Sequence, residues 1–373
     1  MMRVPFVNLG AQFEQLEAEL TDAFVRVGRS GQYILGDEVS RFEQGLAEVC
    51  QTSQAISVAN GTDALVLALK ALNIGPGDEV ITAPNSFIAS AGAIAAVGAE
   101  IRFADVGEDY NLDPIQVEQA ITQRTKAIIV VHLTGNPADM DALAAIARPR
   151  GIALIEDAAQ AIDASYRGRK VGSLGDIACF SLHPLKNLHL MGDAGFISTS
   201  NEELAERMRL LRNHGLLNRD EAQEWAMNSR LDALQAALGN IKLAHLSRWT
   251  ARFREIARVY HQHLAEVVHC PLHRTEDQPV YHNFVIQVDK RSELMQALAE
   301  VGVDTKIHYP IPLHLMQAAK QLPYQRGSFP VAERQASRIL SLPIYPELTD
   351  AQVDYVATQV VQQCLRLGIV KGA

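Results

Sequence analysis

The stretch Phe180-Ser-Leu-His-Pro-Leu-Lys-Asn-Leu188 places a lysine just beyond the apolar run Ile177 to Phe180. Pro184 and Asn187 make this segment turn-forming, and the chain contains only nine lysines. A lysine held in a partly desolvated site has a lowered pKa and can attack a carbonyl as the free amine. Lys186 is therefore a candidate nucleophile, although a lysine in a loop is more often a solvated charge.

Short apolar and β-branched runs recur ahead of this segment, with helix-like patterns between them. The runs are Ala55 to Val58, Val80 to Thr82, Ile101 to Phe103, Ala127 to Val131, Ala153 to Ile155 and Ile177 to Phe180. Several are apolar without alternation, as is typical of strands covered on both faces. The helix-like stretches include Thr62 to Leu72 and Met140 to Arg150. This alternation predicts an α/β fold with a mostly parallel central sheet.

The length of the chain, 373 residues, favours two domains, because single cores usually stop growing at about 250 to 300 residues. A long amphipathic stretch reaches from Ser229 to about Val268. It is followed by the run Val280 to Val288 and by the helix-like stretches Ser292 to Val301 and Gln352 to Leu367. We expect a large domain over residues 1–250 that begins with a helical segment, and a smaller α+β domain over residues 251–373.

Charge and composition argue against nucleic acid and membranes as partners. The net charge is −9, the sequence pI is near 5.7, and no cluster of five or more Lys and Arg residues occurs. Met1 to Leu9 lacks the order of a secretory signal, and Ala89 to Val97 is too short to cross a bilayer. We therefore expect a cytoplasmic protein that binds neither nucleic acid nor membranes.

No metal site is expected. Cys50, Cys179, Cys270 and Cys364 lie roughly a hundred residues apart, so they form neither a metal clamp nor a disulfide framework, and we interpret them as buried or incidental thiols. Glu156 and Asp157 end an apolar run and could be a metal pair or an N-cap, but no cluster of further ligands accompanies them. A carboxylate at the carboxyl end of a parallel strand faces the crevice where such sheets bind ligands.

A candidate anion site lies in Ser57-Val-Ala-Asn-Gly-Thr-Asp-Ala-Leu65, where a strand passes into a helix at Gly61 and Thr62. Free backbone amides at a helix start bind anions, and the helix dipole favours negative charge there. Thr62 or Asp63 could equally be a plain N-cap, which is the commoner role for such residues. Both interpretations stay open on the residues alone.

Several short motifs stand in order along nearly the whole chain. They are Tyr33-Ile-Leu-Gly-Asp37, Asn60-Gly-Thr-Asp-Ala64, Val131-His-Leu-Thr-Gly-Asn-Pro-Ala-Asp-Met140, Glu156-Asp-Ala-Ala-Gln160, Val171-Gly-Ser-Leu-Gly-Asp176, Ser181 to Lys186, Asn228-Ser-Arg-Leu-Asp232, His308-Tyr-Pro-Ile-Pro-Leu-His314 and Ser341-Leu-Pro343. In this order and spacing the sequence resembles the DegT/DnrJ/EryC1/StrS family of sugar aminotransferases. That family belongs to fold type I of the pyridoxal 5'-phosphate (PLP) enzymes, the aspartate aminotransferase superfamily. The resemblance implies a three-layer PLP-transferase fold with a smaller C-terminal α+β domain.

Carried over position by position, the resemblance implies a PLP site. Lys186 would form the Schiff base and move a proton between substrate carbon and cofactor, while Asp157 would keep the pyridine nitrogen protonated. The remaining cofactor contacts would come from Gly61, Thr62 and Ser181 at the phosphate, from Phe87 and Ala159 on the two ring faces, and from Gln160 at the ring hydroxyl. His183, His308 and Tyr309 are the expected substrate contacts.

The resemblance also implies a homodimer with shared active sites, because Asn228 matches a family residue that reaches the phosphate of the neighbouring subunit. Asn228 could instead be the N-cap of the long helix that follows it. The chain departs from the family at Ala194, where most members have glycine, and a positive φ there would strain an alanine. Thr134 and Asn136 replace an aromatic residue and a glutamine of many relatives, so the substrate pocket can differ from the commonest one.

The activity implied by the resemblance is transfer of an amine from an amino acid, L-glutamate, through pyridoxamine phosphate (PMP) to a nucleotide-linked 3- or 4-keto-6-deoxyhexose. In related enzymes that remove a hydroxyl, histidine replaces the lysine, whereas this chain keeps Lys186. For His183 we expect packing or a substrate contact rather than catalysis. Two alternatives stay open: a PLP-dependent sugar dehydratase or deoxygenase, and a non-catalytic PLP-fold protein that binds a sugar for regulation.

Overall fold

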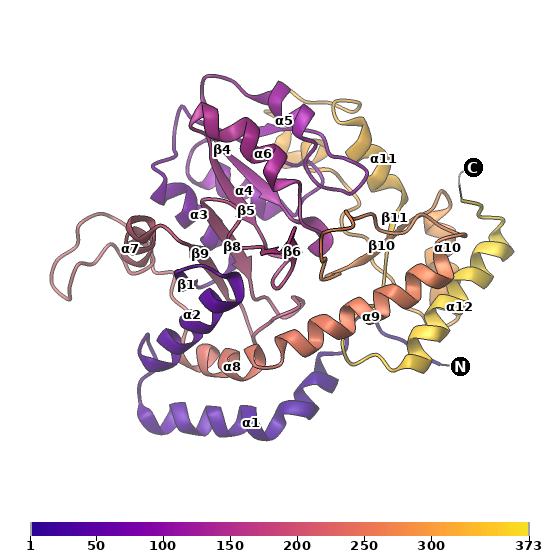
Figure 1. Cartoon of the computed structure of the whole chain (residues 1–373), viewed down its shortest axis with the longest axis horizontal. Coiled ribbons are helices and arrows are strands. Elements are labelled where there is room, and N and C mark those ends of the chain that lie inside the picture. Colours follow the sequence, from indigo (N-terminus) through magenta and orange to yellow (C-terminus); the bar gives the residue numbers. More distant parts are fainter. Residues whose placement is uncertain (1, 372–373) are drawn as a thin grey trace.

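A seven-stranded sheet lies at the centre of the computed structural model, which describes residues 2–371 (Figure 1). Its strands are β1 (Gln54–Val58), β2 (Glu79–Thr82), β3 (Glu100–Phe103), β4 (Thr125–Val131), β5 (Ala153–Asp157), β8 (Ile177–Ser181) and β9 (Gly195–Thr199), in the order β1-β9-β8-β5-β4-β2-β3. Neighbours from β8 to β3 are parallel, and β9 runs antiparallel to both β8 and β1. The predicted mostly parallel α/β sheet is confirmed, and each predicted run lies within a strand. We did not predict β9.

Helices cover both faces of this sheet. On one face lie α3 (Gly61–Ala71), α4 (Ile88–Ala96) and α7 (Glu202–Leu211). On the other lie α2 (Asp37–Cys50), α5 (Pro114–Ala120) and α6 (Met140–Ala147), with α1 (Leu9–Ser30) and α8 (Ala233–Leu243) packed outside α2. Within β4, Ile128 and Val130 join one core cluster, while Ala127 and Ile129 join the other. This two-sided burial explains why the strands are apolar without alternation.

The C-terminal part has an apolar core of its own. This part of the chain contains α9 (Leu246–Leu264), β10 (Phe284–Gln287), α10 (Arg291–Glu300), α11 (Pro330–Arg338), β11 (Ile339–Leu342) and α12 (Asp350–Leu367). The strands β10 and β11 pair antiparallel. Phe253, Tyr260 and Phe284 are among the side chains buried there, and Val4 from the start of the chain joins them. The predicted division at residue 250 falls inside α9, and we keep it as a proposal.

One helix prediction was wrong. The amphipathic stretch from Ser229 to Val268 forms two helices, α8 and α9, rather than one. Between them the amides of Ala244 and His245 bond to carbonyls three residues back, at Ile241 and Lys242, so the α-helical ladder is interrupted. The sequence pattern does not show the break, because apolar residues continue at helical spacing through it.

Short elements complete the chain. They are the hairpin strands β6 (Ser165–Tyr166) and β7 (Arg169–Lys170) and the 3-10 helices η1 (Leu133–Gly135), η2 (Arg148–Arg150), η3 (Leu313–Leu315) and η4 (Gln317–Ala319). Cys50, Cys179 and Cys364 are buried, Cys270 is half-buried, and all four are free thiols. Among the described residues, no helix combines the length and apolar character needed to span a membrane.

Candidate active site

The carboxyl ends of the parallel strands bring the predicted residues to one edge of the sheet. Asp157 ends β5, and Ser181 ends the neighbouring strand β8. In the backbone register Asp157 lies opposite Cys179 on β8 and Val131 on β4. Lys186 follows β8 by five residues, so its loop leaves the sheet at this same edge. This edge is where open α/β sheets bind their ligands.

Asp157 is a buried carboxylate with two hydrogen-bond donors. Its Oδ2 accepts from the Ser90 hydroxyl at 2.7 Å, and its Oδ1 accepts from the Ala159 amide at 3.3 Å. Burial raises the pKa of Asp157, whereas these two donors and the charge of Lys186 oppose that rise. The donors and the nearby amine favour the charged carboxylate that a pyridinium nitrogen requires. The sequence analysis missed Ser90, which stands four residues after Ser86 and lies in the first turn of α4.

Lys186 occupies a turn in which its own amide donates to the His183 carbonyl at 2.8 Å. Burial lowers the pKa of its amine to about 8, and the charge of Asp157 opposes this shift. The amine and the carboxylate therefore lie within electrostatic reach of one another. The structure does not support a solvated loop charge at Lys186.

The start of α3 leaves two amides without partners. Asn60 is the N-cap, since its Oδ1 accepts from the Asp63 amide at 2.8 Å. The alternative in which Thr62 or Asp63 caps the helix was therefore wrong, and the Asp63 carboxylate instead accepts from the Ser229 hydroxyl at 2.7 Å. The amides of Gly61 and Thr62 donate to no other residue within 2–371. They remain available to an anion.

Two glycines allow the backbone around this anion site to pack closely. A Cβ on Gly61 would lie 2.9 Å from Cβ of Ser181, and a Cβ on Gly195 would lie 2.5 Å from the carbonyl carbon of Asn60. Gly195 begins β9 and pairs with Ser181, which brings the start of α3 against the end of β8. Gly195 is thus a site residue that the sequence analysis missed, although it directly follows Ala194 in Gly192-Asp-Ala-Gly195.

The predicted strain at Ala194 is absent. Positive φ in this motif belongs to Gly192, at 156°, and not to Ala194. Ala194 is buried, and its carbonyl accepts from the Leu182 amide at 2.8 Å. Alanine is compatible with this backbone, because its φ lies in a region that any residue can adopt.

The ring contacts expected from the resemblance lie around Tyr309. The Phe87 ring is 52% exposed and its centroid is 5.6 Å from that of Tyr309. The Gln160 amide donates to the Tyr309 hydroxyl at 3.4 Å and accepts from the Thr134 amide at 2.6 Å. Phe87, Gln160 and Tyr309 are far apart in sequence, and the fold brings them together. Ala159, between Asp157 and Gln160, is half-buried.

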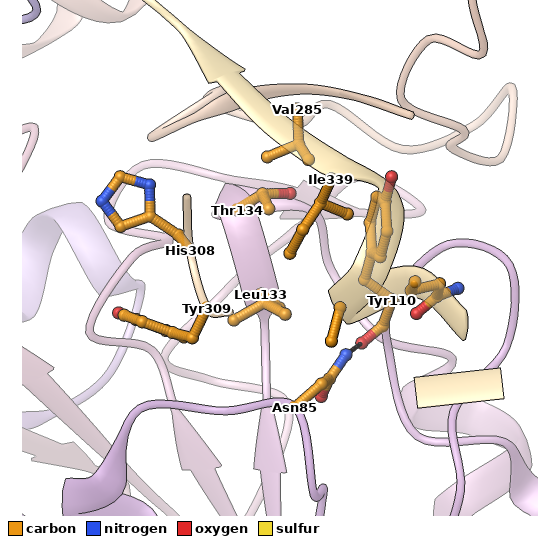
Figure 2. Close-up of a pocket in the computed structure, with 10 residues that line it drawn as sticks. Asn85, Tyr110, Leu133, Thr134, Val285, His308, Tyr309 and Ile339 are labelled. Atoms are coloured by element: carbon orange, nitrogen blue, oxygen red, sulfur yellow. Dashed lines mark hydrogen bonds between the residues drawn. The ribbon is translucent and has the colours of Figure 1, made fainter. Parts of the chain in front are cut away.

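A narrow cavity lies beside Tyr309, between the central sheet and the C-terminal part (Figure 2). Figure 2 shows His308 and Tyr309 on one side of it and Tyr110 on the other. Its walls come from the loop after β4, from β10 and β11, and from the segment before α4; they include Leu133, Thr134, Val285, Ile339 and Asn85. The Asn85 amide donates to the Tyr110 carbonyl at 2.9 Å. Thr134, which departs from the family, therefore lines a cavity next to the candidate site.

The two predicted substrate histidines have different surroundings. His183 is exposed, and its Nδ1 accepts from the Leu185 amide at 3.3 Å, which is a packing contact within the loop. His308 is half-buried, with Nδ1 2.9 Å from the Ser341 hydroxyl. Burial and the charge of Lys186 lower the pKa of His308 to about 4. His308 is therefore neutral at physiological pH.

Asn228 is exposed and pairs through its backbone with Asn213. The N-cap of α8 is Asp232, so the alternative that made Asn228 a helix cap was wrong. Its neighbour Ser229 packs on the start of α3, where it contacts the Ala59 amide and Asp63. No hydrogen bond joins the Asn228 side chain to another predicted site residue within the described part of the chain.

Glu156 does not act with Asp157. Its carboxylate is fully buried and accepts from the amides of Gly172, Leu174 and Gly175. Its Oε2 also lies 3.0 Å from Nε2 of His132. Consecutive strand residues point to opposite faces, so Glu156 anchors the loop before β8 while Asp157 faces the site. Residues 2–371 contain no group of three or more side chains placed to hold a metal ion.

Comparison with known proteins agrees with this geometry. The family model described as "DegT/DnrJ/EryC1/StrS aminotransferase family" matches residues 14–361. A protein of Geobacillus stearothermophilus named "Pleiotropic regulatory protein" is 44% identical, with 97% of this chain and 98% of the relative covered. The dTDP-3-amino-3,4,6-trideoxy-alpha-D-glucose transaminase of Streptomyces venezuelae is 45% identical, with 94% and 93% covered.

Solved structures are similar over the same length. The crystal structure of S. venezuelae DesV, in complex with a ketimine intermediate, has a TM-score of 0.96 and 44% identity, and it covers 98% of this chain and 99% of its own. More distant structures at 27% and 31% identity are described with PMP. The three-layer PLP-transferase fold predicted from the sequence is confirmed.

Proposed function

Because the chain belongs to the DegT/DnrJ/EryC1/StrS aminotransferase family, we propose that it transfers an amine from an amino acid to a keto-sugar carried on a nucleotide. The observation that carries this proposal is the amine of Lys186 within electrostatic reach of the buried carboxylate of Asp157. Both lie at the sheet edge where the Gly61 and Thr62 amides are available to an anion.

The residues at this edge fit PLP. We assign the phosphate to the Gly61 and Thr62 amides and the Ser181 hydroxyl, since the close approach of Gly61 to Ser181 leaves no room for a side chain between them. Asp157 is the partner of the ring nitrogen, and Phe87 and Ala159 supply the two ring faces. Gln160 takes the ring hydroxyl. When bound, PLP supplies an electron sink for the negative charge that develops at the substrate carbon.

Within this site the chain itself provides acid–base chemistry and orientation. With its pKa lowered to about 8, Lys186 has a free-base fraction near neutral pH and can take a proton from the substrate carbon and return it. The hydroxyl of Ser90 favours the anionic form of Asp157, which would hold a proton on the ring nitrogen of bound PLP. Tyr309, hydrogen-bonded to Gln160, stands with Phe87 at the mouth of the site.

The substrates follow from the family and from the relatives. The name of the S. venezuelae relative places an amine on carbon 3 of a dTDP-linked sugar. We therefore propose a nucleotide-linked 3- or 4-keto-6-deoxyhexose as acceptor, with the 3-keto form the first to test, and L-glutamate as donor. His308 and Tyr309 are the proposed sugar contacts. Action in the cytoplasm stays a prediction.

A homodimer is part of the proposal. A groove between α1 and α8 is lined by the exposed apolar side chains of Phe13, Phe24 and Met191. Met191 is 55% exposed and stands five residues after Lys186, and Leu185 beside that lysine is 52% exposed. Contiguous exposed apolar surface of this kind marks an interface. We propose that a second copy docks at this groove and contributes its exposed Asn228 segment to the site.

The test is a screen of keto-sugar nucleotides with and without L-glutamate, with products identified by mass. Glutamate-dependent gain of an amino group supports the proposal. Loss of a hydroxyl without incorporation of nitrogen would show the dehydratase or deoxygenase, which the presence of Lys186 disfavours. The name of the G. stearothermophilus relative is the reason to keep the regulatory alternative. That alternative requires a bound cofactor whose absorbance does not change when any amino donor is added.

A further inference from the structure

A second set of polar groups, outside the cofactor contacts, holds the segment that follows Lys186. The Asn187 side chain is buried at 6% exposure, and its Nδ2 donates to the Val280 carbonyl at 3.0 Å. Its Oδ1 lies 3.0 Å from Nδ1 of His282. Val280 and His282 precede β10, so these bonds join the lysine loop to the C-terminal part of the chain.

These contacts fix the tautomer of His282. A backbone carbonyl only accepts, so the amide nitrogen of Asn187 must face Val280 and the amide oxygen must face His282. An amide oxygen also only accepts, so Nδ1 of His282 carries the proton. Burial, together with the charge of Lys186, lowers the pKa of His282 well below its usual value. The ring is therefore neutral, and Nε2 is a hydrogen-bond acceptor.

His282 and Lys186 line the same small cavity of about 40 Å³ at the junction of the N-terminal segment, the lysine loop and the segment after β11. No residue within 2–371 donates a hydrogen bond to Nε2 of His282. The titratable groups coupled electrostatically to Lys186 are Asp157 from β5 and His282 and His308 from the C-terminal part. The cavity is also lined by the titratable side chains of His189, Tyr345 and Glu347. Asp157 is assigned to the ring nitrogen, and Nδ1 of His308 is engaged by Ser341.

We propose that His282 is a positioning residue for Lys186. When the amine of Lys186 is protonated, Nε2 of His282 accepts a hydrogen bond from Nζ–H. This inference rests on the proposed function. When the substrate C–H bond breaks, its proton forms a bond to Nζ of Lys186, and the electron pair stays on the substrate side. His282 accepts one N–H of the resulting ammonium as a hydrogen bond and takes no proton itself. It thereby orients the ammonium for return of the proton.

An acceptor that bonds the charged form of an amine stabilises that form. Removing the acceptor at Nε2 should therefore lower the pKa of Lys186 further, while loosening of the loop into water should raise it toward its ordinary value. The two effects have opposite signs. The sign of the change separates positioning of Lys186 from a merely structural role.

The experiment uses two matched variants of the cofactor-free protein. His282→Asn keeps an amide close to Asn187 and has no acceptor at the position of Nε2, whereas His282→Gln places an amide oxygen near that position. The probe is acetic anhydride, and acetylation of the Lys186 peptide is followed by mass spectrometry across pH. We expect the wild-type midpoint near 8. His282→Asn should lower it by about one pH unit, the size expected for loss of a hydrogen bond to a charged group, and His282→Gln should restore most of this shift.

An unchanged or raised midpoint in His282→Asn would overturn the proposal, as would equal shifts in both variants. Nitrogen NMR of protein labelled with 15N-histidine supplies an independent measurement, because the proposal requires the proton of His282 on Nδ1. A proton on Nε2 would overturn it even if a variant failed to fold. Neither measurement uses a sugar substrate, so failure of the proposed transamination would be seen separately in the substrate screen.

Discussion

The hydroxyl of Ser90 donates to Oδ2 of Asp157 over 2.7 Å, in a place where Ser90 is fully buried and Asp157 is 6% exposed. The hydroxyl of Ser86 lies a further 2.7 Å from that of Ser90. Since a carboxylate only accepts, Ser90 donates its hydrogen bond to Asp157 and accepts one from the hydroxyl of Ser86. This pair of hydrogen bonds favours a negative charge on Asp157 against the cost of burial, and the proposed role of Asp157 at the ring nitrogen requires that charge.

Replacement of Ser90 by alanine should weaken PLP binding and lower turnover by about tenfold or more, the effect of losing a hydrogen bond to a charged group. Ser86→Ala is the matched control, because it removes a buried hydroxyl of the same pair and leaves the bond to Asp157 in place. Both are read by cofactor titration and steady-state rates. Equal losses in the two variants would contradict this role of Ser90.

Reduction of the PLP-loaded protein with borohydride should label Lys186 alone. Lys242 is an internal comparison, because burial also lowers its pKa to about 8, but its charged neighbour is Glu347. Lys186→Ala should lower turnover by about 10²- to 10⁴-fold, the usual contribution of a general acid–base group. Peptide mapping of the reduced protein is the measurement. Label on Lys242 would show that a lowered pKa, rather than the site geometry, selects the lysine.

Gly195→Ala should lower PLP affinity strongly, because the new Cβ would lie 2.5 Å from the carbonyl carbon of Asn60 and 2.8 Å from the Gly61 amide nitrogen. Both contacts are with backbone, so the first turn of α3 has to move. Gly92→Ala in α4 is the control: its Cβ would meet nothing within 4 Å. Cofactor titration distinguishes the two, and unchanged affinity in Gly195→Ala would exclude the anion site at α3.

Stability of the cofactor-free protein should depend on pH through Lys186. The pKa of Lys186 is about 8 in the folded chain and 10.5 in the unfolded chain. Between these two pH values the unfolded chain therefore binds more protons than the folded chain. The cost of charging the folded lysine is therefore full below pH 8 and vanishes above 10.5. Lys186→Met should stabilise the protein at pH 7 by about 1 to 3 kcal/mol.

The pH dependence of that gain is the diagnostic feature, because better packing of methionine would stabilise equally at every pH. Chemical denaturation of both proteins from pH 7 to 10 measures it. A gain that stays constant over this range would show that the amine is not desolvated in the folded chain.

Hybrid dimers should show whether Asn228 acts across subunits. In a dimer of one Lys186→Ala chain and one Asn228→Ala chain, a site shared between subunits would pair intact Lys186 from one chain with intact Asn228 from the other. Because isologous symmetry gives the dimer two equivalent sites, of which one is intact in the hybrid, the hybrid should recover about half of wild-type activity. Its intact site should bind PLP with wild-type affinity. Hybrids no better than the Asn228→Ala homodimer would place Asn228 in the site of its own chain.

The sequence alone predicted six of the seven strands of the central sheet and the sheet type, and it supplied the residues proposed to hold the cofactor. Apolar runs without alternation predict two-sided burial because each strand carries its own pattern, and Lys186, Asp157 and Gly61 stand in motifs that keep their spacing along the chain. The strand β9 was missed because Gly195–Thr199 is short and begins with glycine, a residue that is more typical of turns than of strands. The domain boundary at residue 250 remains a prediction.

Only the tertiary structure decided which side chains support those motifs. Ser90 meets Asp157 across 67 positions of sequence, and Asn187 meets His282 across 95. Gly195 is needed because β9 carries it against the first turn of α3. Local patterns record which face of an element is buried, but not which distant residue meets it. Those contacts are set by the packing of separate elements, so hydrogen-bond partners, close backbone approaches and tautomers appear only once the chain is folded.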